Sequence, residues 1–263
     1  MKYLITGGAG FIGSTLADSL LADGHEITVV DNFSDYYDIS LKETNVVHNI
    51  NNKNYILYRS DIEDKAKLSD IFKNDKFDAV IHLAARAGVR SSLEAPSAYI
   101  RSNIIGTVNV LDCMKDYGVK KLVFASSSSV YGNCKEDKFS EDLKVTEPIS
   151  PYAATKSACE QICYTWHHLY DISIVALRFF TVYGPRQRPD LAINKFAHLI
   201  DVNLPVEMYG DGSTMRDYTY IDDIISGIKS AINYDKSGYE IISALVNVPH
   251  SVMKQHSRKR YVD

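Results

Sequence analysis

Apolar, β-rich runs alternate with helical patterns through the first two thirds of this 263-residue chain. Strands have near-continuous apolar sequences when helices cover both faces of a parallel sheet. The alternation therefore predicts an α/β fold with a doubly wound parallel sheet. The expected strands are Lys2–Thr6, Glu26–Asp31, Tyr55–Arg59, Ala79–Leu83, Lys121–Ser126 and Ser173–Arg178, and the expected helices are Ser14–Asp23, Lys65–Asp75, Pro96–Tyr117 and Pro151–Tyr170.

A glycine-rich segment, residues 7–13, follows the first expected strand and leads directly into a helix. Gly7 permits a tight turn, Gly10 lets backbone amides approach a pyrophosphate, and Gly13 allows close helix packing. The order of strand, glycines and helix predicts a Rossmann-like dinucleotide site, and the alternative is a simple turn. The cofactor contacts expected in this segment are Gly7, Gly10, Phe11, Ile12 and Gly13.

Asp31 ends the second expected strand, where an acidic side chain accepts hydrogen bonds from ribose hydroxyls and repels a 2′-phosphate. No Arg or Lys lies within several residues after Asp31, which favours NAD over NADP. Asp61 and Ile62 follow the third expected strand, and we expect them to contact the adenine. The alternative for Asp61 is a helix N-cap, which would not exclude the adenine contact.

Tyr152 and Lys156 lie four residues apart, on one face of a helix if Pro151 begins it. A free tyrosine has a pKa of about 10, too high for an efficient base near neutrality. An ammonium group and an oxidised nicotinamide ring both favour the phenolate and lower this pKa. A serine run, residues 126–129, ends the fifth expected strand and can offer a hydroxyl to the same substrate oxygen. We therefore expect Ser127, Tyr152 and Lys156 to be catalytic, with Lys156 also binding the nicotinamide ribose.

The bulk composition argues against several classes of partner. The net charge of -4 gives no general attraction to nucleic acid or to an anionic membrane surface. No stretch is long enough for a membrane span or a signal peptide. The four cysteines and eight histidines show no metal-ligand spacing, so we expect no metal, buried or idle thiols, and a reducing cytoplasmic location.

From Met1 to about Ile242 the sequence resembles the extended short-chain dehydrogenases/reductases of the NAD-dependent nucleotide-sugar epimerase/dehydratase family. The resemblance implies NAD as cofactor and a nucleotide sugar as substrate. It also implies that Asn103 supports the catalytic strand ends and that Phe179, Phe180 and Thr181 face nicotinamide and sugar. The segments that carry it are Asp31-Asn32-Phe33, His82–Ala85, Tyr99–Gly106, Ser150–Ala153, Leu177–Pro185 and Arg216–Tyr220. The further cofactor contacts that it implies are Asn32, Leu83, Ala84, Ala85, Asn103 and Phe179.

Within this family, Ser128 and Ser129 indicate the reaction. Related 4,6-dehydratases carry Asp-Glu after the catalytic hydroxyl residue, and related decarboxylases carry Glu just before Val-Tyr-Gly. Neither acid is present here, so the expected reaction is reversible oxidation at one carbon. Tyr152, assisted by Ser127, would take the C4 hydroxyl proton, and the 4-keto sugar would present its other face before the hydride returns. The expected outcome is 4-epimerisation.

Arg188 bears on the choice of sugar. Asp35–Asp38, Ala87–Arg90 and Phe180–Pro185 resemble UDP-glucuronate 4-epimerases, which present an arginine at this position to the C6 carboxylate. Uncharged-sugar epimerases can share the surrounding pattern, so UDP-glucose and UDP-N-acetylglucosamine stay open, and Arg186 and Arg188 could meet only phosphate or solvent. The substrate contacts that the resemblance implies are Arg90, Ser127, Ser128, Ser129, Tyr152, Thr181, Arg188 and Arg216, where Arg216 resembles the diphosphate-binding arginine but could instead pair with Asp217 or Asp222.

We expect three regions: an NAD-binding domain at 1–178, a partial substrate-binding region at 179–242, and an atypical tail at 243–263. Family members usually continue for longer, which suggests a truncated or frame-shifted end here. An inactive NAD-binding protein is therefore the alternative class. By resemblance, the helices Pro96–Tyr117 and Pro151–Tyr170 would form a homodimer interface, and the pathway would be surface polysaccharide synthesis.

Overall fold

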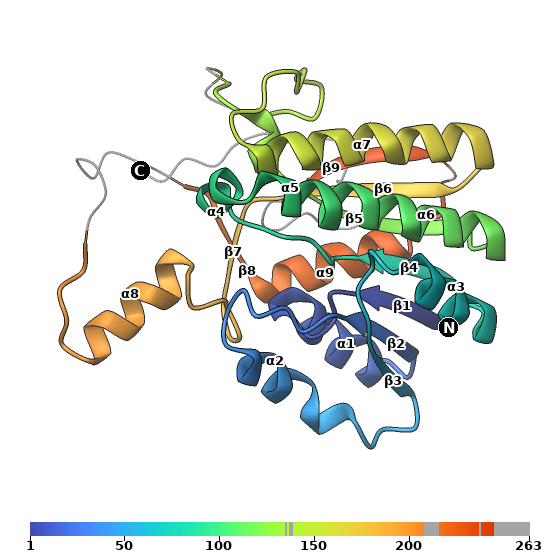
Figure 1. Cartoon of the computed structure of the whole chain (residues 1–263), viewed down its shortest axis with the longest axis horizontal. Coiled ribbons are helices and arrows are strands. Elements are labelled where there is room, and N and C mark those ends of the chain that lie inside the picture. The colour runs from blue at the N-terminus through green and yellow to red at the C-terminus, as the bar shows by residue number, and fades with distance from the viewer. Residues whose placement is uncertain (135, 137–138, 208–215, 237, 245–263) are drawn as a thin grey trace.

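A seven-stranded parallel sheet with helices on both faces forms the centre of the computed structural model, which describes residues 1–134, 136, 139–207, 216–236 and 238–244 (Figure 1). The strand order is β3-β2-β1-β4-β5-β6-β9. The prediction of a doubly wound parallel sheet is confirmed. The strands are β1 (Lys2–Thr6), β2 (Glu26–Asp31), β3 (Tyr55–Arg59), β4 (Ala79–His82), β5 (Lys121–Ser127), β6 (Ser173–Phe179) and β9 (Tyr239–Ala244).

The strand order reverses between β1 and β4, since β2 and β3 lie on one side of β1 while β4, β5 and β6 lie on the other. Open parallel sheets bind ligands at the carboxyl ends of the strands beside such a reversal. The glycine segment follows β1, the segment 83–88 follows β4, and Ser127 ends β5. The sheet therefore places all three predicted parts of the site along one edge.

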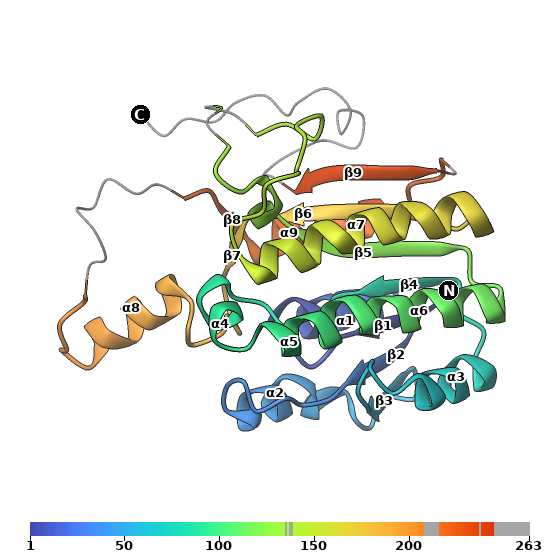
Figure 2. The same cartoon turned by 45° about the horizontal axis from the view of Figure 1, so that its top comes forward.

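Two layers of helices bury the apolar faces of the sheet. On one face, α1 (Phe11–Ala22) packs with α9 (Ile221–Ile232), where Leu16 and Ile228 are fully buried. On the other, α3 (Lys65–Asn74), α6 (Gly106–Tyr117) and α7 (Pro151–Tyr170) lie side by side (Figure 2). In the described part of the chain, no helix is both long and apolar enough to cross a membrane.

The asparagine-rich segment Asn45–Asn54, for which the sequence pattern indicates no helix, is partly helical. It contains the end of α2 (Ile39–Val46) and the 3₁₀ turn Val47–Asn49. The pattern missed α2 because the side chains that it buries are Lys42, Asn45 and Val46, so its inner face is mostly polar. Asp38 caps the helix by accepting a hydrogen bond from the Ser40 N–H at 2.9 Å.

The expected helix Pro96–Tyr117 is continuous but irregular. It begins as α5 (Pro96–Tyr99), passes through a π-helical segment at Ile100–Ile105 and ends as α6. Such π segments occur often at functional sites. A further short helix, α4 (Val89–Glu94), precedes it and was not predicted.

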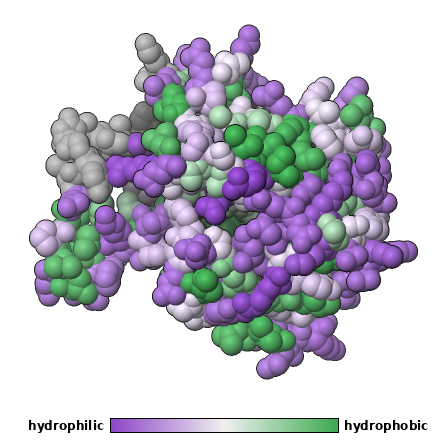
Figure 3. All heavy atoms as spheres, in the orientation of Figure 1, coloured by the Kyte–Doolittle hydropathy of each residue, from purple (hydrophilic) through white to green (hydrophobic). Residues whose placement is uncertain are grey.

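After Arg178 the chain contributes to the main sheet and also leaves it. A second small sheet pairs β7 (Thr181–Tyr183) with β8 (Tyr218–Tyr220), while β9 returns to the main sheet beside β6. The helix α8 (Ala192–Asp201) stands apart from the sheet and has no buried residue, and Figure 3 shows its apolar side chains in view. The domain boundary at residue 178 stays a prediction. Of the expected tail 243–263, residues 245–263 lie outside the described part.

Candidate active site

The glycine segment has the close backbone contacts that require glycine. Gly7 adopts a φ of 73°, and a Cβ atom there would lie 2.7 Å from the Ala84 nitrogen. A Cβ atom on Gly13 would lie 2.3 Å from the carbonyl oxygen of Gly7. The turn after β1, the start of α1 and the segment after β4 therefore touch one another, and larger residues would separate them.

The start of α1 fits a pyrophosphate. The helix begins at Phe11, three residues before the predicted start, and its N-cap Gly10 provides no side-chain hydrogen bond. The first backbone N–H groups of a helix have no partner within it and attract anions. The amides of Phe11 and Ile12 therefore suit the diphosphate of a dinucleotide.

Asp31 lies at the end of β2 and is 7% exposed. It accepts hydrogen bonds from the N–H groups of Ala9 at 3.0 Å and Phe33 at 2.8 Å. A carboxylate has about four acceptor positions, so acceptors remain for ribose hydroxyls. Asp31 thus holds the backbone of the glycine segment through Ala9, and its remaining acceptor positions suit the ribose hydroxyls of NAD.

Lys42 was missed by sequence reasoning. Its ammonium lies 4.0 Å from an Asp31 carboxylate oxygen and donates to the Ser34 carbonyl at 2.9 Å. Burial lowers the pKa of Lys42, and the Asp31 charge acts in the opposite direction. Lys42 is remote from Asp31 in sequence and belongs to the unpredicted α2, so no local signal connects the two.

Asn32 and Asp61 meet across neighbouring strand ends. The Asn32 amide donates to Asp61 Oδ2 at 2.7 Å, and Asp61 also accepts from the Glu63 N–H at 2.9 Å. The alternative of Asp61 as a helix N-cap is wrong, because Asp64 caps α3. Ile62 is 4% exposed and belongs to the buried apolar cluster against α6. Contact of Asp61 and Ile62 with adenine stays a prediction.

Asn103 holds the segment after β4. Its amide oxygen accepts from the Arg86 N–H at 2.7 Å, and its amide nitrogen donates to the Arg86 carbonyl at 3.0 Å and to Thr155 Oγ1 at 2.9 Å. The residue is 1% exposed. These bonds link the π-helical segment, α7 and the chain just beyond Leu83, Ala84 and Ala85.

His82 precedes that segment as a buried neutral imidazole. Its Nδ1 lies 2.6 Å from Thr6 Oγ1 and its Nε2 lies 3.0 Å from Thr107 Oγ1. Burial, with a smaller effect of the Lys156 charge, lowers the pKa of His82 to about 3. This connection between β1, β4 and α6 was not predicted, because a lone histidine has no distinctive spacing.

The predicted start of α7 is confirmed. Ser150 caps the helix by accepting from the Ala153 N–H at 3.1 Å, and Pro151 occupies its first position. Tyr152 is half-buried, and its ring lies 6.2 Å from that of Tyr99 in a T-shaped arrangement. The start of α7 thus brings Tyr152 to the end of β5.

Burial raises the pKa of Tyr152, while interaction with the Ser127 hydroxyl and the charge of Arg188 act in the opposite direction. The sequence predicts a lowered pKa for Tyr152, and burial opposes this lowering. Sequence reasoning did not connect Arg188 with Tyr152. The structure shows this guanidinium as one cation that favours the phenolate.

Lys156 is 4% exposed, and its Nζ donates to the Ala125 carbonyl at 2.7 Å. Burial lowers the pKa of Lys156, and interactions with Cys159, Cys163 and Glu160 act in the opposite direction. Ser127 is 7% exposed and accepts from the Ser129 N–H at 3.2 Å. Tyr152, Lys156 and Ser127 thus converge where β5 meets α7.

The other predicted substrate contacts are more dispersed. Ser128 and Ser129 are partly exposed in the 3₁₀ turn after Ser127, and Thr181 is partly exposed at the start of β7. Arg90 and Arg216 are exposed. Phe179 is 8% exposed at the end of β6, beside Ser127 in the sheet register.

Arg186 and Arg188 diverge. Arg186 pairs with Asp18 of α1 at 2.8 Å and donates to Ser14 at 3.2 Å, so it meets the cofactor-side helix. Arg188 holds both Asp190 carboxylate oxygens, at 2.9 and 2.6 Å, and lies 5.1 Å from the Tyr36 ring centroid. Both arginines contact carboxylates of the protein, so the alternative that they meet only phosphate or solvent is wrong.

Tyr36 is joined to Tyr99 by Ser91, a chain that sequence reasoning missed. Ser91 Oγ lies 2.7 Å from the Tyr36 hydroxyl and 2.9 Å from the Tyr99 hydroxyl. Tyr99 in turn packs against Tyr152. The residues beside Arg188 are therefore connected to Tyr152.

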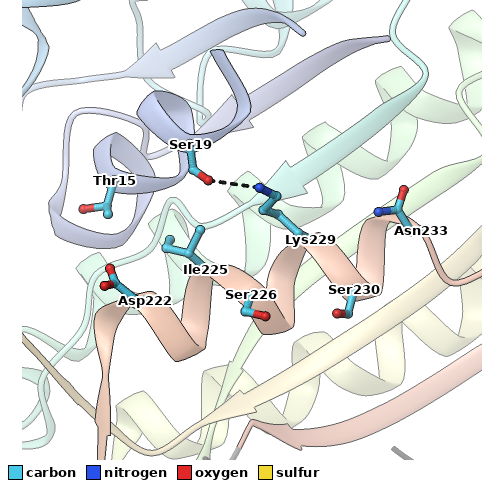
Figure 4. Close-up of a pocket in the computed structure, with 8 residues that line it drawn as sticks. All are labelled: Thr15, Ser19, Asp222, Ile225, Ser226, Lys229, Ser230 and Asn233. Atoms are coloured by element: carbon cyan, nitrogen blue, oxygen red, sulfur yellow. Dashed lines mark hydrogen bonds between the residues drawn. The ribbon is translucent and has the colours of Figure 1, made fainter. Parts of the chain in front are cut away.

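A separate hollow of about 370 Å³ lies between α1 and α9 (Figure 4). Lys229 enters it and donates to Ser19 at 3.2 Å. Its lining consists of Thr15, Ser19, Asp222, Ile225, Ser226, Lys229, Ser230 and Asn233, and none of the predicted site residues is among them. Within the described ranges, no group of three or more His, Cys, Asp or Glu side chains could hold a metal ion.

Known proteins are similar to this chain in sequence and in fold. The chain is 49% identical over 241 residues to a UDP-glucuronate 4-epimerase of Thermodesulfobacterium geofontis, covering 92% of this chain and 74% of that protein. The crystal structure of the Bacillus cereus UDP-glucuronic acid 4-epimerase with UDP-glucuronic acid and NAD is similar, with a TM-score of 0.87 and 39% identity, covering 93% of this chain and 77% of that chain. The structure of the UDP-N-acetylglucosamine 4-epimerase of Methanobrevibacter ruminantium M1, in complex with UDP-N-acetylmuramic acid, is also similar. Its TM-score is 0.83 at 34% identity, and the match covers 92% of this chain and 75% of that chain.

The family model described as the NAD dependent epimerase/dehydratase family matches residues 3–244. The glycine segment, the open start of α1 and Asp31 fit the cofactor that this family uses. The chain therefore belongs to the NAD dependent epimerase/dehydratase family, and it is an NAD-dependent epimerase.

Proposed function

We propose that this protein inverts C4 of the sugar in a UDP-sugar, and that its substrate is UDP-glucuronate, which becomes UDP-galacturonate. The observation that carries the choice of sugar is Arg188. Its guanidinium already makes a two-bond contact with a carboxylate, that of Asp190, and its charge acts on Tyr152. A group of this geometry, beside the catalytic tyrosine, suits the C6 carboxylate of a uronate.

The proton chemistry belongs to Tyr152, Ser127 and Lys156. Tyr152 takes the proton of the C4 hydroxyl and returns it after the sugar has turned, while Ser127 hydrogen-bonds the same oxygen. Lys156, directed at the strand end, stabilises the phenolate. When bound, NAD supplies the acceptor and donor of the C4 hydride.

The named relatives support UDP-glucuronate over uncharged sugars. The T. geofontis relative and the B. cereus structure are both UDP-glucuronate enzymes. A UDP-N-acetylglucosamine enzyme also matches, at lower identity. UDP-glucose and UDP-N-acetylglucosamine are therefore the substrates against which the proposal is tested.

The test follows the anomeric proton signals of the protein with UDP-glucuronate, UDP-glucose and UDP-N-acetylglucosamine in turn. A galacto-configured product from UDP-glucuronate alone is the expected result. A product from an uncharged sugar alone would overturn the choice of substrate.

Tyr152→Phe tests the catalytic role, because it removes only the hydroxyl. It should abolish turnover and leave NAD affinity near that of the unaltered protein. Tyr99→Phe is the matched control, since it removes a hydroxyl from the ring packed against Tyr152 and should retain most of the turnover. Near-normal turnover in Tyr152→Phe would contradict the catalytic role of Tyr152.

We also infer that the chain forms a homodimer through α7 and the helical run from α5 to α6. These helices contact one another and still expose Ile100, Ile105, Tyr164 and Leu169, each about half exposed. Figure 3 shows part of this apolar surface over α5. A monomeric mass in sedimentation equilibrium at micromolar concentration would contradict the inference.

A further inference from the structure

Two buried charged residues next to the catalytic groups have no role in the proton chemistry above. Glu160 lies on α7, one turn beyond Lys156, and is 3% exposed. Arg178 lies near the end of β6 and is 1% exposed. Their ion pair joins the helix that carries Tyr152 to the strand beside β5.

Three successive residues at the end of β5 each contact one residue of α7. The Ala125 carbonyl accepts from Lys156, and Ser126 Oγ donates to Glu160 Oε1 at 2.5 Å. Ser127 interacts with Tyr152. Lys156 and Glu160 therefore contact adjacent residues at the same strand end.

Lys156 and Glu160 have the spacing at which oppositely charged side chains pair on a helix. A buried carboxylate without a partner is strongly destabilising, so it pairs with the nearest cation. Here the two side chains are directed to different partners. Both Glu160 oxygens are held by Arg178, with Nε to Oε1 at 2.9 Å and Nη2 to Oε2 at 2.8 Å.

Arg178 is itself fixed in place. Its guanidinium lies 4.8 Å from the Tyr131 ring centroid, and the Tyr131 hydroxyl lies 3.0 Å from Ser243 Oγ of β9. The Tyr239 hydroxyl, also from β9, donates to the Glu160 carbonyl at 2.8 Å. The edge strand β9 therefore contacts both Tyr131 and α7 beside the ion pair.

We propose that Arg178 is a positioning residue: by holding both oxygens of Glu160, it prevents this carboxylate from capturing Lys156 and leaves the ammonium directed at the catalytic strand end. The inference rests on the proposed role of Tyr152 and Lys156. Without Arg178, Glu160 pairs with Lys156 along the helix. The ammonium then no longer stabilises the Tyr152 phenolate.

The charged and titratable groups around this set come from several elements. Those facing Tyr152, Lys156 and Glu160 are Cys159 and Cys163 on α7, His82 on β4, Tyr99 on α5, Tyr131 after β5, Arg178 on β6, Arg188 after β7 and Tyr239 on β9.

The test measures the pH midpoint of Tyr152 ionisation, as the difference in phenolate absorbance between each protein and its Tyr152→Phe counterpart. Arg178→Met should raise the midpoint by about one pH unit. The double variant Glu160→Gln/Arg178→Met should return it to the original value, because the competing carboxylate is gone. The pH midpoint is measured without turnover. The positioning role of Arg178 can therefore fail while the epimerase assignment stands, and the epimerase assignment can fail while the positioning role stands.

A merely structural role gives a different pattern. Cys113→Ser, on the neighbouring helix α6 and fully buried, is the matched control that disturbs packing away from the ion pair, and its midpoint should not move. If Arg178→Met does not fold, Arg178→Lys replaces it, and its single nitrogen should give a smaller rise. An unmoved midpoint in the Arg178 variant that folds, or no return in the double variant, would overturn the proposal.

Discussion

Two glycines of the cofactor segment, Gly10 and Gly13, should respond differently to the same added methyl group. At Gly10 the backbone has a φ of -75° and a ψ of 179°, which alanine adopts readily, and the nearest atom to an added Cβ is 3.4 Å away. At Gly13 the added Cβ would lie 2.3 Å from the Gly7 carbonyl oxygen. The first methyl therefore disturbs mainly a ligand, and the second disturbs the protein itself.

The magnitudes follow from these distances. Gly10→Ala should change the free energy of unfolding by less than about 1 kcal/mol, because the conformation is compatible with alanine. It should weaken NAD binding about tenfold to a hundredfold, since displacing a phosphate from the amides loses at least one charge-assisted hydrogen bond of about 1.5–3 kcal/mol. Gly13→Ala overlaps two backbone atoms by roughly 1 Å and should destabilise the fold by about 2–3 kcal/mol or more.

Denaturant unfolding and calorimetric titration with NAD measure the two effects separately. Gly227→Ala is the matched control, because its added Cβ has nothing within 4 Å, and it should retain NAD affinity. If Gly10→Ala binds NAD as tightly as the unaltered protein, the segment does not hold the pyrophosphate in the way inferred here. If Gly13→Ala unfolds at the same denaturant concentration, the close packing of α1 is not as described.

Three further variants test the site. Arg188→Leu should raise the KM for UDP-glucuronate about tenfold to a hundredfold and leave UDP-glucose turnover nearly unchanged, and equal losses for both sugars would contradict a carboxylate contact. Asp31→Asn should lower NAD affinity and raise NADP affinity, because Lys42 lies 4.0 Å away and loses its counter-charge; an unchanged ratio in competition calorimetry would refute this. His82 is expected to titrate near its ordinary pKa of 6.5 when unfolded and at about 3 when folded, so its contribution to stability is complete above pH 6.5 and falls as pH drops towards 3, by up to about 1.4 kcal/mol per pH unit. Between pH 7 and pH 5, the free energy of unfolding of His82→Gln should therefore fall less than that of the unaltered protein. An equal fall in both proteins would contradict this.

The sheet was predictable because its signals are local. The runs Lys2–Thr6, Glu26–Asp31 and Tyr55–Arg59 have the predicted bounds, and each of the next three strands differs by one residue. Buried parallel strands must be apolar throughout, and tight turns must contain glycine, so both features are visible in a short window. The start of α7 at Pro151 was predictable for the same reason.

The side-chain contacts were not predictable in this way, because they join residues far apart in the chain. Lys42 meets Asp31 through an unpredicted helix, and Arg186 reaches Asp18 of α1 rather than a substrate. The ion pair of Glu160 with Arg178 links a helix to a strand end. Such pairings depend on the packing of elements, and the residues themselves have no characteristic spacing.

The pairing of α1 with α9 has a consequence for synthesis on the ribosome. The apolar face of the first helix, with Leu16 and Leu20, is buried against Ile224 and Ile228, some of the last residues that the structure describes. Because N-terminal segments emerge first, α1 must wait for nearly all of the described chain before this surface is covered. During that interval the nascent protein exposes an apolar helix face to chaperones, and the native sheet gains its last strand, β9, only afterwards.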